Sequence, residues 1–151
     1  MTASRAGVPT PGQPLSTAHL GASIEELQAA LEGLADHHPG DMAYRIHRSA
    51  AIKQFELILE LSGKLLRMRL RDWFASNREV DRLVFKDVFR AAARFTLISS
   101  EACERWLEYR DHRNDTAHDY GETYPEATLR ILPRFVEDTR ALRDALDGTY
   151  D

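Results

Sequence analysis

The residues from Tyr109 to Tyr120 form the densest group of reactive side chains in this sequence. Within that group, Arg113 and His118 are the pair with a clear chemical use. An arginine that holds a phosphate and a histidine that moves a proton are the minimum for metal-free RNA cleavage, because the 2′-hydroxyl itself attacks the adjacent phosphorus. The same residues also fit a solvated helix C-terminus, where cationic side chains complement the helix dipole.

Arg113 and His118 can converge only if the helix that carries them ends or bends. On an unbroken helix, residues five positions apart are separated by about 500°, so the two side chains would lie about 140° apart. The sequence Asn114-Asp115-Thr116 weakens a helix, because these side chains compete for backbone hydrogen bonds. We therefore expect the helix to end near Asp115.

Apolar residues at helical spacing predict five helices that position this group. Two capping boxes and one N-cap mark three of the starts; they are Ser23-Ile24-Glu25-Glu26, Thr123-Tyr124-Pro125-Glu126 and Ser99-Ser100. The five helices are expected from Ser23 to just before His38, and then over residues 42–75, 83–98, 100–114 and 123–146. Ser76 to Glu79 is interpreted as a polar linker, and Pro133 should kink the last helix or shift its start.

No segment alternates like a strand, so the predicted fold is all-α, an up-and-down bundle of four or five helices with short loops. The length of 151 residues fits one domain. Residues 1–21 hold three of the six prolines and lack apolar periodicity, which predicts a disordered tail before a domain over 22–151. The core should include Cys103, with Trp73 and Trp106 in the core or at a dimer interface, and Ser62-Gly63 should allow a close helix approach.

The charge and the cysteine content exclude several classes of protein. A net charge of −4 argues against nucleic-acid binding by bulk charge, although it leaves room for a local basic pocket. The basic residues are seventeen arginines and three lysines, which suits bidentate phosphate contacts but is also what a GC-rich genome produces. A single cysteine forms no internal disulfide and no Cys-based zinc site. Without a long apolar segment or a secretory signal, we expect a cytoplasmic protein.

Other ionisable residues have simpler interpretations. His37, His38 and His47 are irregularly spaced and are expected to be surface histidines, so no metal site is predicted. His112 is next to Arg113 but should point away from its face of the helix.

Two further groups of charged residues lie on the long second helix. Glu56 and Glu60 should pair with arginines or shape a partner cleft. Arg67, Arg69 and Arg71 spread around the helix and are expected to be a solvated surface, with an RNA-approach surface as the alternative.

Arg113-Asn114-x-x-x-His118-x-Tyr120 resembles the R-x4-H-x-Y motif of HEPN domains, in particular those paired with a minimal nucleotidyltransferase. The resemblance covers residues 23 to 151. Three other segments are similar to the family long described as nucleotidyltransferase substrate-binding proteins; they are Ala51 to Glu56 with Glu60-Leu61, Phe85 to Val88 with Arg94 to Ile98, and Trp106 with Tyr109 to Asp111. The sequence has no Gly-rich phosphate loop and no Gly-Ser followed by paired aspartates, so it should not itself transfer nucleotides.

The resemblance implies a homodimer in which the motifs of two subunits form one ribonuclease site that needs no cofactor. Arg113 would hold the scissile phosphate, His118 would act as general base or acid, and Asn114 would position Arg113 or the RNA. The nucleotidyltransferase partner would be the antitoxin and would silence the toxin by transferring AMP to Tyr120, which adds charge and bulk beside the site. Asp119 is an anion within the motif, which argues against strong RNA binding. The alternative is a non-catalytic subunit that presents substrate to the same partner.

Overall fold

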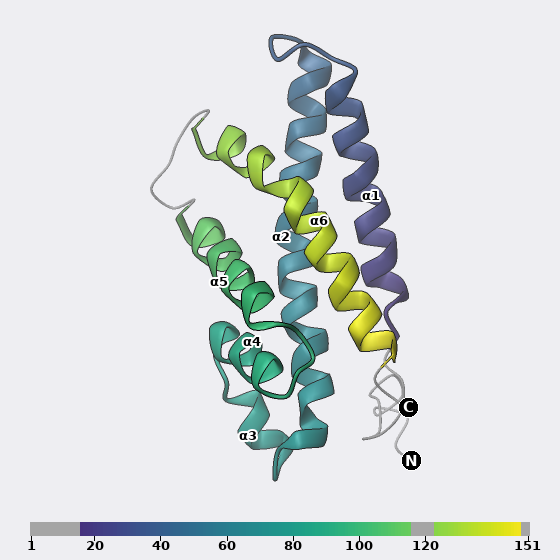
Figure 1. The fold of residues 1–151 in the computed structure, drawn as a ribbon. Helices are drawn as coiled ribbons and strands as arrows, with labels where there is room; N and C mark the ends of the chain where they lie inside the picture. Colours follow the sequence, from purple (N-terminus) through teal and green to yellow (C-terminus); the bar gives the residue numbers. More distant parts are fainter. Residues whose placement is uncertain (1–15, 116–122, 149–151) are drawn as a thin grey trace, which may run out of the picture.

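The computed structural model describes residues 16–115 and 123–148, which form six α-helices, one 3-10 helix and no strand (Figure 1). The helices are α1 (Ala18–Ala35), α2 (Met42–Leu70), η2 (Arg71–Trp73), α3 (Asn77–Asp81), α4 (Phe85–Arg94), α5 (Ser100–Asn114) and α6 (Thr123–Gly148). The predicted all-α bundle is confirmed. None of these helices carries a stretch long and apolar enough to cross a bilayer.

The long helix α2 is the centre of the bundle. It lies against α1 along most of its length, and α6 packs across both of them (Figure 1). Helices α4 and α5 contact each other and pack against α2 on the side away from α1. This arrangement brings α2, α4 and α6 around α5, the helix that ends in Arg113.

Aromatic rings fill the space between α2, α4, α5 and α6. Phe55, Phe89, Trp106 and Phe135 are all fully buried. Trp106 stacks on Phe89 with ring centroids 4.8 Å apart, and Phe55 meets Phe135 edge to face at the same distance. Such pairs add about 0.5–1.5 kcal/mol each to the free energy of area burial, so this cluster fixes how α5 sits on the bundle.

Helix α1 begins at Ala18 rather than at the predicted capping box. Ser23 is 5% exposed and faces the bundle, and Leu20 is fully buried inside the segment predicted as a tail. Burial of Leu20 and the hydrogen bond from the Thr17 hydroxyl to Asp147 (2.6 Å) stabilise the first turn of α1. No local signal in the sequence predicts this turn. Residues 1–15 lie outside the described residues.

The region between α2 and α5 is also divided differently from the prediction. Ser76 accepts a hydrogen bond from the backbone N–H of Glu79 at 3.2 Å, so the segment interpreted as a linker starts helix α3, which buries Val80. Helix α4 stops at Arg94, before the predicted end at Ile98, because Thr96 adopts a left-handed conformation with φ of 63°. Helix α2 stops at Leu70 and tightens into η2 before the predicted end at Ala75.

The ends of α5 and α6 agree better with the sequence. The predicted N-cap at Ser99 is confirmed, since its hydroxyl accepts a hydrogen bond from the Ala102 N–H at 3.0 Å. Helix α5 ends at Asn114, where the Asn-Asp-Thr sequence predicted an end. Helix α6 starts at Thr123 and continues through Pro133, which is on its exposed side.

The prediction of a solvated arginine surface at the end of α2 is wrong. Arg69 is 1% exposed and donates from Nη2 to the backbone oxygen of Leu146 at the end of α6 (2.5 Å). Arg67 donates from Nη1 to the backbone oxygens of Val80 and Leu83, at 2.8 and 2.7 Å. Both arginines thus donate to backbone carbonyls of other elements, Arg69 near the end of α6 and Arg67 around the end of α3. Those partners are distant in sequence, so helical spacing alone could not reveal them.

Candidate functional site

The candidate site is built around the last turn of α5, which carries Arg113. Its guanidinium pairs with Glu56 of α2, with Nε and Oε2 3.5 Å apart. One turn earlier on α5, Arg110 pairs with Glu60 of α2 at 2.6 Å. The expectation that these glutamates pair with arginines is therefore confirmed. The Arg113 side chain is 37% exposed, so it remains open to a ligand from solvent.

The side chains between these arginines contact two other helices. Asp111 pairs with Lys86 of α4 at 2.5 Å. His112 turns to α6, where its Nε2 lies 2.6 Å from the Thr128 hydroxyl. Every residue from Arg110 to Arg113 thus has a partner on another helix. The last turn of α5 is held from three sides, and this fixes the place from which Arg113 projects.

His112 is placed to donate a hydrogen bond to α6. The Thr128 hydroxyl donates its own proton to the backbone oxygen of Tyr124 (2.8 Å), so it accepts from His112 Nε2. The imidazole also stacks on the Tyr124 ring, with centroids 4.8 Å apart. Burial lowers the pKa of His112, and Arg130 acts in the same direction while Asp115 opposes it. As predicted, His112 points away from Arg113, which reaches the opposite neighbour, α2.

Tyr124 places a buried hydroxyl close to the same turn. Its side chain is 8% exposed. Burial raises the pKa of Tyr124; Thr128 and the charge of Arg113 lower it, and the charge of Glu56 raises it. The Tyr124 ring stacks on His112 and so packs against the last turn of α5.

A buried carboxylate connects α5 to α6 below the site. Asp138 of α6 accepts from Arg105 Nε and Nη2 at 2.9 and 2.8 Å, and from the Tyr109 hydroxyl at 2.5 Å. Burial, followed by this hydrogen bond, raises the pKa of Tyr109, while the bond to Asp138 raises the pKa of Arg105. Together with His112 and Thr128, this bidentate contact sets the distance between the facing sides of the two helices.

The start of α6 is held by α2. Glu126 accepts from Arg48 Nη1 at 2.8 Å and from the Tyr44 hydroxyl at 3.2 Å. Arg48 is buried, whereas the Glu126 side chain is 39% exposed, so the pair is only partly desolvated. Both ends of the chain segment that connects α5 to α6 are therefore fixed on α2.

The structure describes only two of the four predicted site residues. Arg113 lies at the α5–α2 contact, and Asn114 is the exposed last residue of α5. His118, Tyr120 and Asp119 lie outside the described residues. They belong to the segment that leaves α5 directly after Arg113 and Asn114 and returns at Thr123.

The remaining candidate residues lie elsewhere. His37 and His47 stack with centroids 5.4 Å apart, and the described ranges contain no group of three or more His, Cys, Asp or Glu residues that could hold a metal. Cys103 is buried in the core, as predicted, and burial raises the pKa of its thiol. Trp106 belongs to the core, whereas Trp73 is 41% exposed and stacks on Phe95.

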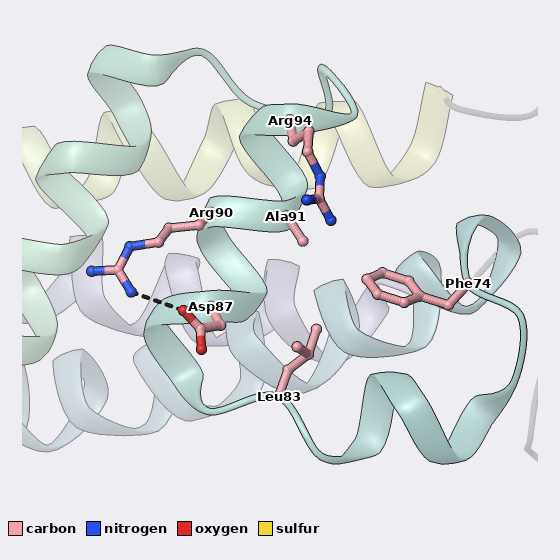
Figure 2. Close-up of a pocket in the computed structure, with 6 residues that line it drawn as sticks. All are labelled: Phe74, Leu83, Asp87, Arg90, Ala91 and Arg94. Atoms are coloured by element: carbon pink, nitrogen blue, oxygen red, sulfur yellow. Dashed lines mark hydrogen bonds and ion pairs between the residues drawn. The ribbon is translucent and has the colours of Figure 1, made fainter.

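A cavity of about 400 Å³ opens beside α4, where Phe74 and Leu83 face it (Figure 2). Phe74, Leu83 and Ala91 provide its apolar lining. Of its two arginines, Arg90 pairs with Asp87 at 2.8 Å, while the Arg94 guanidinium lies 5.1 Å from the centre of the Phe95 ring. The lining residues hold no nucleophile and no pair of titratable groups suited to proton transfer, so we do not place the reaction here.

Sequence reasoning missed the groups on α6 that hold α5 in place. Asp138 and Thr128 are buried polar residues on the apolar side of an amphipathic helix. A polar residue at a core position needs a hydrogen-bond partner, so their positions in the helical pattern were a usable signal.

The described bundle, with an arginine presented at the end of α5 beside a motif histidine in the sequence, defines an all-α protein of HEPN type. A family model described as "Nucleotidyltransferase substrate binding protein like" matches residues 15–148. The chain belongs to this family, and the resemblance stated from the motif is confirmed.

Individual relatives agree with this assignment. "Probable ribonuclease HepT" of Haemophilus influenzae is 29% identical over 131 residues, which cover 84% of this chain and 88% of that protein. The solved structure of HI0074 from Haemophilus influenzae, described as the fold of a substrate-binding domain of a nucleotidyltransferase, matches with a TM-score of 0.76 and 26% identity. That match covers 87% of this chain and 98% of HI0074. A Thermus thermophilus structure, ttk003001694, is 28% identical with a TM-score of 0.62, covering 82% of this chain and 98% of its own.

Proposed function

We propose that this chain is a HEPN toxin, a metal-independent endoribonuclease that works as a homodimer in the cytoplasm. The observation that carries the proposal is the sequence motif Arg113-x4-His118-x-Tyr120, whose first residue lies in the last turn of α5, in a chain similar over most of its length to a protein named as a ribonuclease. Arg113 is partly exposed and held in place by its neighbours on α5, which suits an arginine that receives a phosphate.

In the proposed reaction, Arg113 holds the scissile phosphate and neutralises the charge that grows on it. The RNA 2′-oxygen forms a bond to phosphorus while the bond from phosphorus to the 5′-oxygen breaks. His118 takes the proton from the 2′-hydroxyl or gives one to the departing 5′-oxygen, and water serves for the other proton. The products are a 2′,3′-cyclic phosphate and a 5′-hydroxyl. Asn114, exposed beside Arg113, positions the arginine or the RNA backbone.

The partner in this proposal is a minimal nucleotidyltransferase that acts as the antitoxin. It transfers AMP from ATP to the Tyr120 hydroxyl and releases pyrophosphate. The added phosphate repels the RNA backbone and its adenosine occupies space beside Arg113 and His118. Intact mass of the chain after incubation with such a partner, in wild type and in Tyr120→Phe, tests this step.

A second candidate function is favoured by the family description itself. HI0074 is described as a substrate-binding domain of a nucleotidyltransferase. In that role, Arg113 and His118 would only bind phosphate, and the chain would present a substrate to its partner without cleaving RNA.

One experiment separates the two functions. The chain is produced without a partner, checked by intact mass for adducts, and incubated with total RNA in EDTA beside His118→Ala. We expect wild type alone to cleave and to leave 2′,3′-cyclic phosphate ends. Removal of a general acid–base should lower the rate by about 10²–10⁴-fold.

Circular dichroism of both proteins serves as the folding control. Absence of cleavage by unmodified wild type, across several classes of RNA, would contradict the toxin proposal and favour the substrate-presenting subunit. Equal cleavage by His118→Ala would remove His118 from the mechanism.

A further inference from the structure

A small hollow lies beside the Arg113–Glu56 pair, at the junction of α2, α4 and α5. Its volume is about 270 Å³, and it is lined by Glu60, Gly63, Lys64, Arg67, Phe85 and Arg110. This volume exceeds the roughly 30 Å³ of a water molecule many times over. We call it the α2–α5 hollow.

The lining of the α2–α5 hollow is mainly cationic. Lys64, Arg67 and Arg110 bring three positive charges, against the single carboxylate of Glu60. This local excess contrasts with the chain as a whole, whose net charge is −4. Lys64 is exposed and, within the described ranges, forms no ion pair.

The floor of the α2–α5 hollow depends on the absence of a side chain at Gly63. A Cβ at Gly63 would lie 2.9 Å from Cε2 of Phe85, so glycine lets the Phe85 ring lie directly on α2, as the Ser62-Gly63 pair suggested. The Arg110 guanidinium sits 4.6 Å from the centre of that ring. The ring therefore supports Arg110 in a fixed position at the wall of the hollow.

Another anion can replace the Glu60 carboxylate that pairs with Arg110. The Glu60 side chain is 63% exposed, and exposed ion pairs contribute only about 0–1 kcal/mol. A phosphate forms the stronger bidentate contact with a guanidinium, so it can take the place of Glu60 on Arg110.

The α2–α5 hollow also lies where it could bind the phosphate next to the one proposed on Arg113. Glu60 follows Glu56 by one turn of α2, a rise of about 6 Å, and Arg110 precedes Arg113 by nearly one turn of α5. Two cationic positions therefore lie side by side along the α2–α5 contact, within reach of adjacent nucleotides of one strand.

We propose that the α2–α5 hollow is a second phosphate-binding subsite for single-stranded RNA, in which Lys64 and Arg110 hold the phosphate next to the one on Arg113. The inference rests on the proposed ribonuclease function. It adds the path that the RNA strand takes across the protein. An extended strand follows the contact between α2 and α5, and Glu60 competes with it for Arg110.

The test measures binding of a fluorescent RNA oligonucleotide whose riboses are all 2′-O-methylated, so that it cannot be cleaved. Fluorescence anisotropy of the full chain gives Kd over a series of salt concentrations. For Lys64→Gln we expect Kd to rise about fivefold at low salt, and the slope of log K against log salt to shrink by about 0.7, the loss of one single-strand phosphate contact. For Glu60→Gln we expect tighter binding, because the competing carboxylate is gone.

Arg140→Gln is the matched control, since it removes one exposed positive charge from α6, outside the hollow. Its Kd should stay close to that of wild type. Binding by Lys64→Gln equal to wild type, or equal weakening in Arg140→Gln, would overturn the subsite while leaving the ribonuclease proposal intact. The subsite would also be overturned if Lys64→Gln bound a partner protein more weakly than wild type but bound RNA equally well. If wild type neither binds nor cleaves RNA, the proposed function falls together with the subsite.

Discussion

His112 and Arg113 are adjacent in sequence but belong to different environments. The Arg113 side chain is partly exposed against Glu56, whereas the His112 ring is packed between Phe55 and Tyr124 and donates to Thr128. Partial burial of an imidazole favours its neutral form. The histidine of this turn that the structure describes is therefore suited to holding α5 in place, and not to proton transfer.

The lowered pKa of His112 predicts a pH dependence of stability. As pH falls through the ordinary value of 6.5, the unfolded chain takes up a proton that folded His112 resists, so the free energy of unfolding falls. This loss is absent above that pH, where His112 is neutral in both states. In His112→Gln, an uncharged donor, we expect a smaller drop in unfolding free energy between about pH 7.5 and about pH 5.5. Urea unfolding at both pH values measures it, and an unchanged drop would contradict the assignment.

At the scale of the helices, α5 is positioned by polar contacts as much as by its apolar side. Arg105, Tyr109 and His112 follow one another at helical spacing and all reach α6. Their partners, Asp138 and Thr128, occupy core positions of that helix. Directional contacts of this kind fix the axial position of a helix, which apolar contacts alone define loosely. The placement of Arg113 thus depends on α6 as well as on α2.

Asp138→Asn tests the importance of this connection. The amide cannot replace the charged bidentate contact to Arg105 and leaves Tyr109 with a weaker acceptor. We expect the free energy of unfolding to fall by about 2–3 kcal/mol. Asp144→Asn, an exposed change on the same helix, should stay within about 0.5 kcal/mol of wild type. Urea denaturation compares them, and equal values for the two variants would show that Asp138 does not stabilise the contact.

At the scale of the whole molecule, the bundle presents Arg113 at its surface rather than in an enclosed cavity. The α2–α5 hollow is mainly cationic, and the lining of the cavity beside α4 contains no catalytic group. Within residues 16–115 and 123–148, one subunit therefore offers little to shield a reaction at Arg113 from water. This openness supports the proposal that two subunits complete the site.

Mixing two inactive variants tests whether the proposed site is shared. Arg113→Ala and His118→Ala should each be inactive as homodimers. After the two are unfolded together and refolded, a mixed dimer contains one intact arginine and one intact histidine. We expect partial recovery of RNA cleavage in EDTA. Recovery no greater than the sum of the separate proteins would mean that each subunit works alone, and native mass spectrometry confirms that mixed dimers formed.

Several features of the fold could be predicted from the sequence because nearby residues decide them. The Ser99 cap, the end of α5 at Asn114 and the buried Cys103 follow from local hydrogen bonding and helical spacing. The capping box at Ser23 has the same local pattern, yet α1 continues past it, because Leu20 gains burial against the bundle. A local signal therefore predicts a helix end only where packing does not extend the helix.

The sequence by itself determined the all-α class, the family and the motif with Arg113, because periodicity and spacing are properties of one segment of chain. Only the tertiary structure decided which charges meet. Glu56 and Arg113 are on separate helices, as are Asp138 and Arg105, and Arg69 reaches the far end of α6. Such pairs depend on how helices cross and on which side chains lose water when they do. That is a property of the packed molecule, which no local pattern contains.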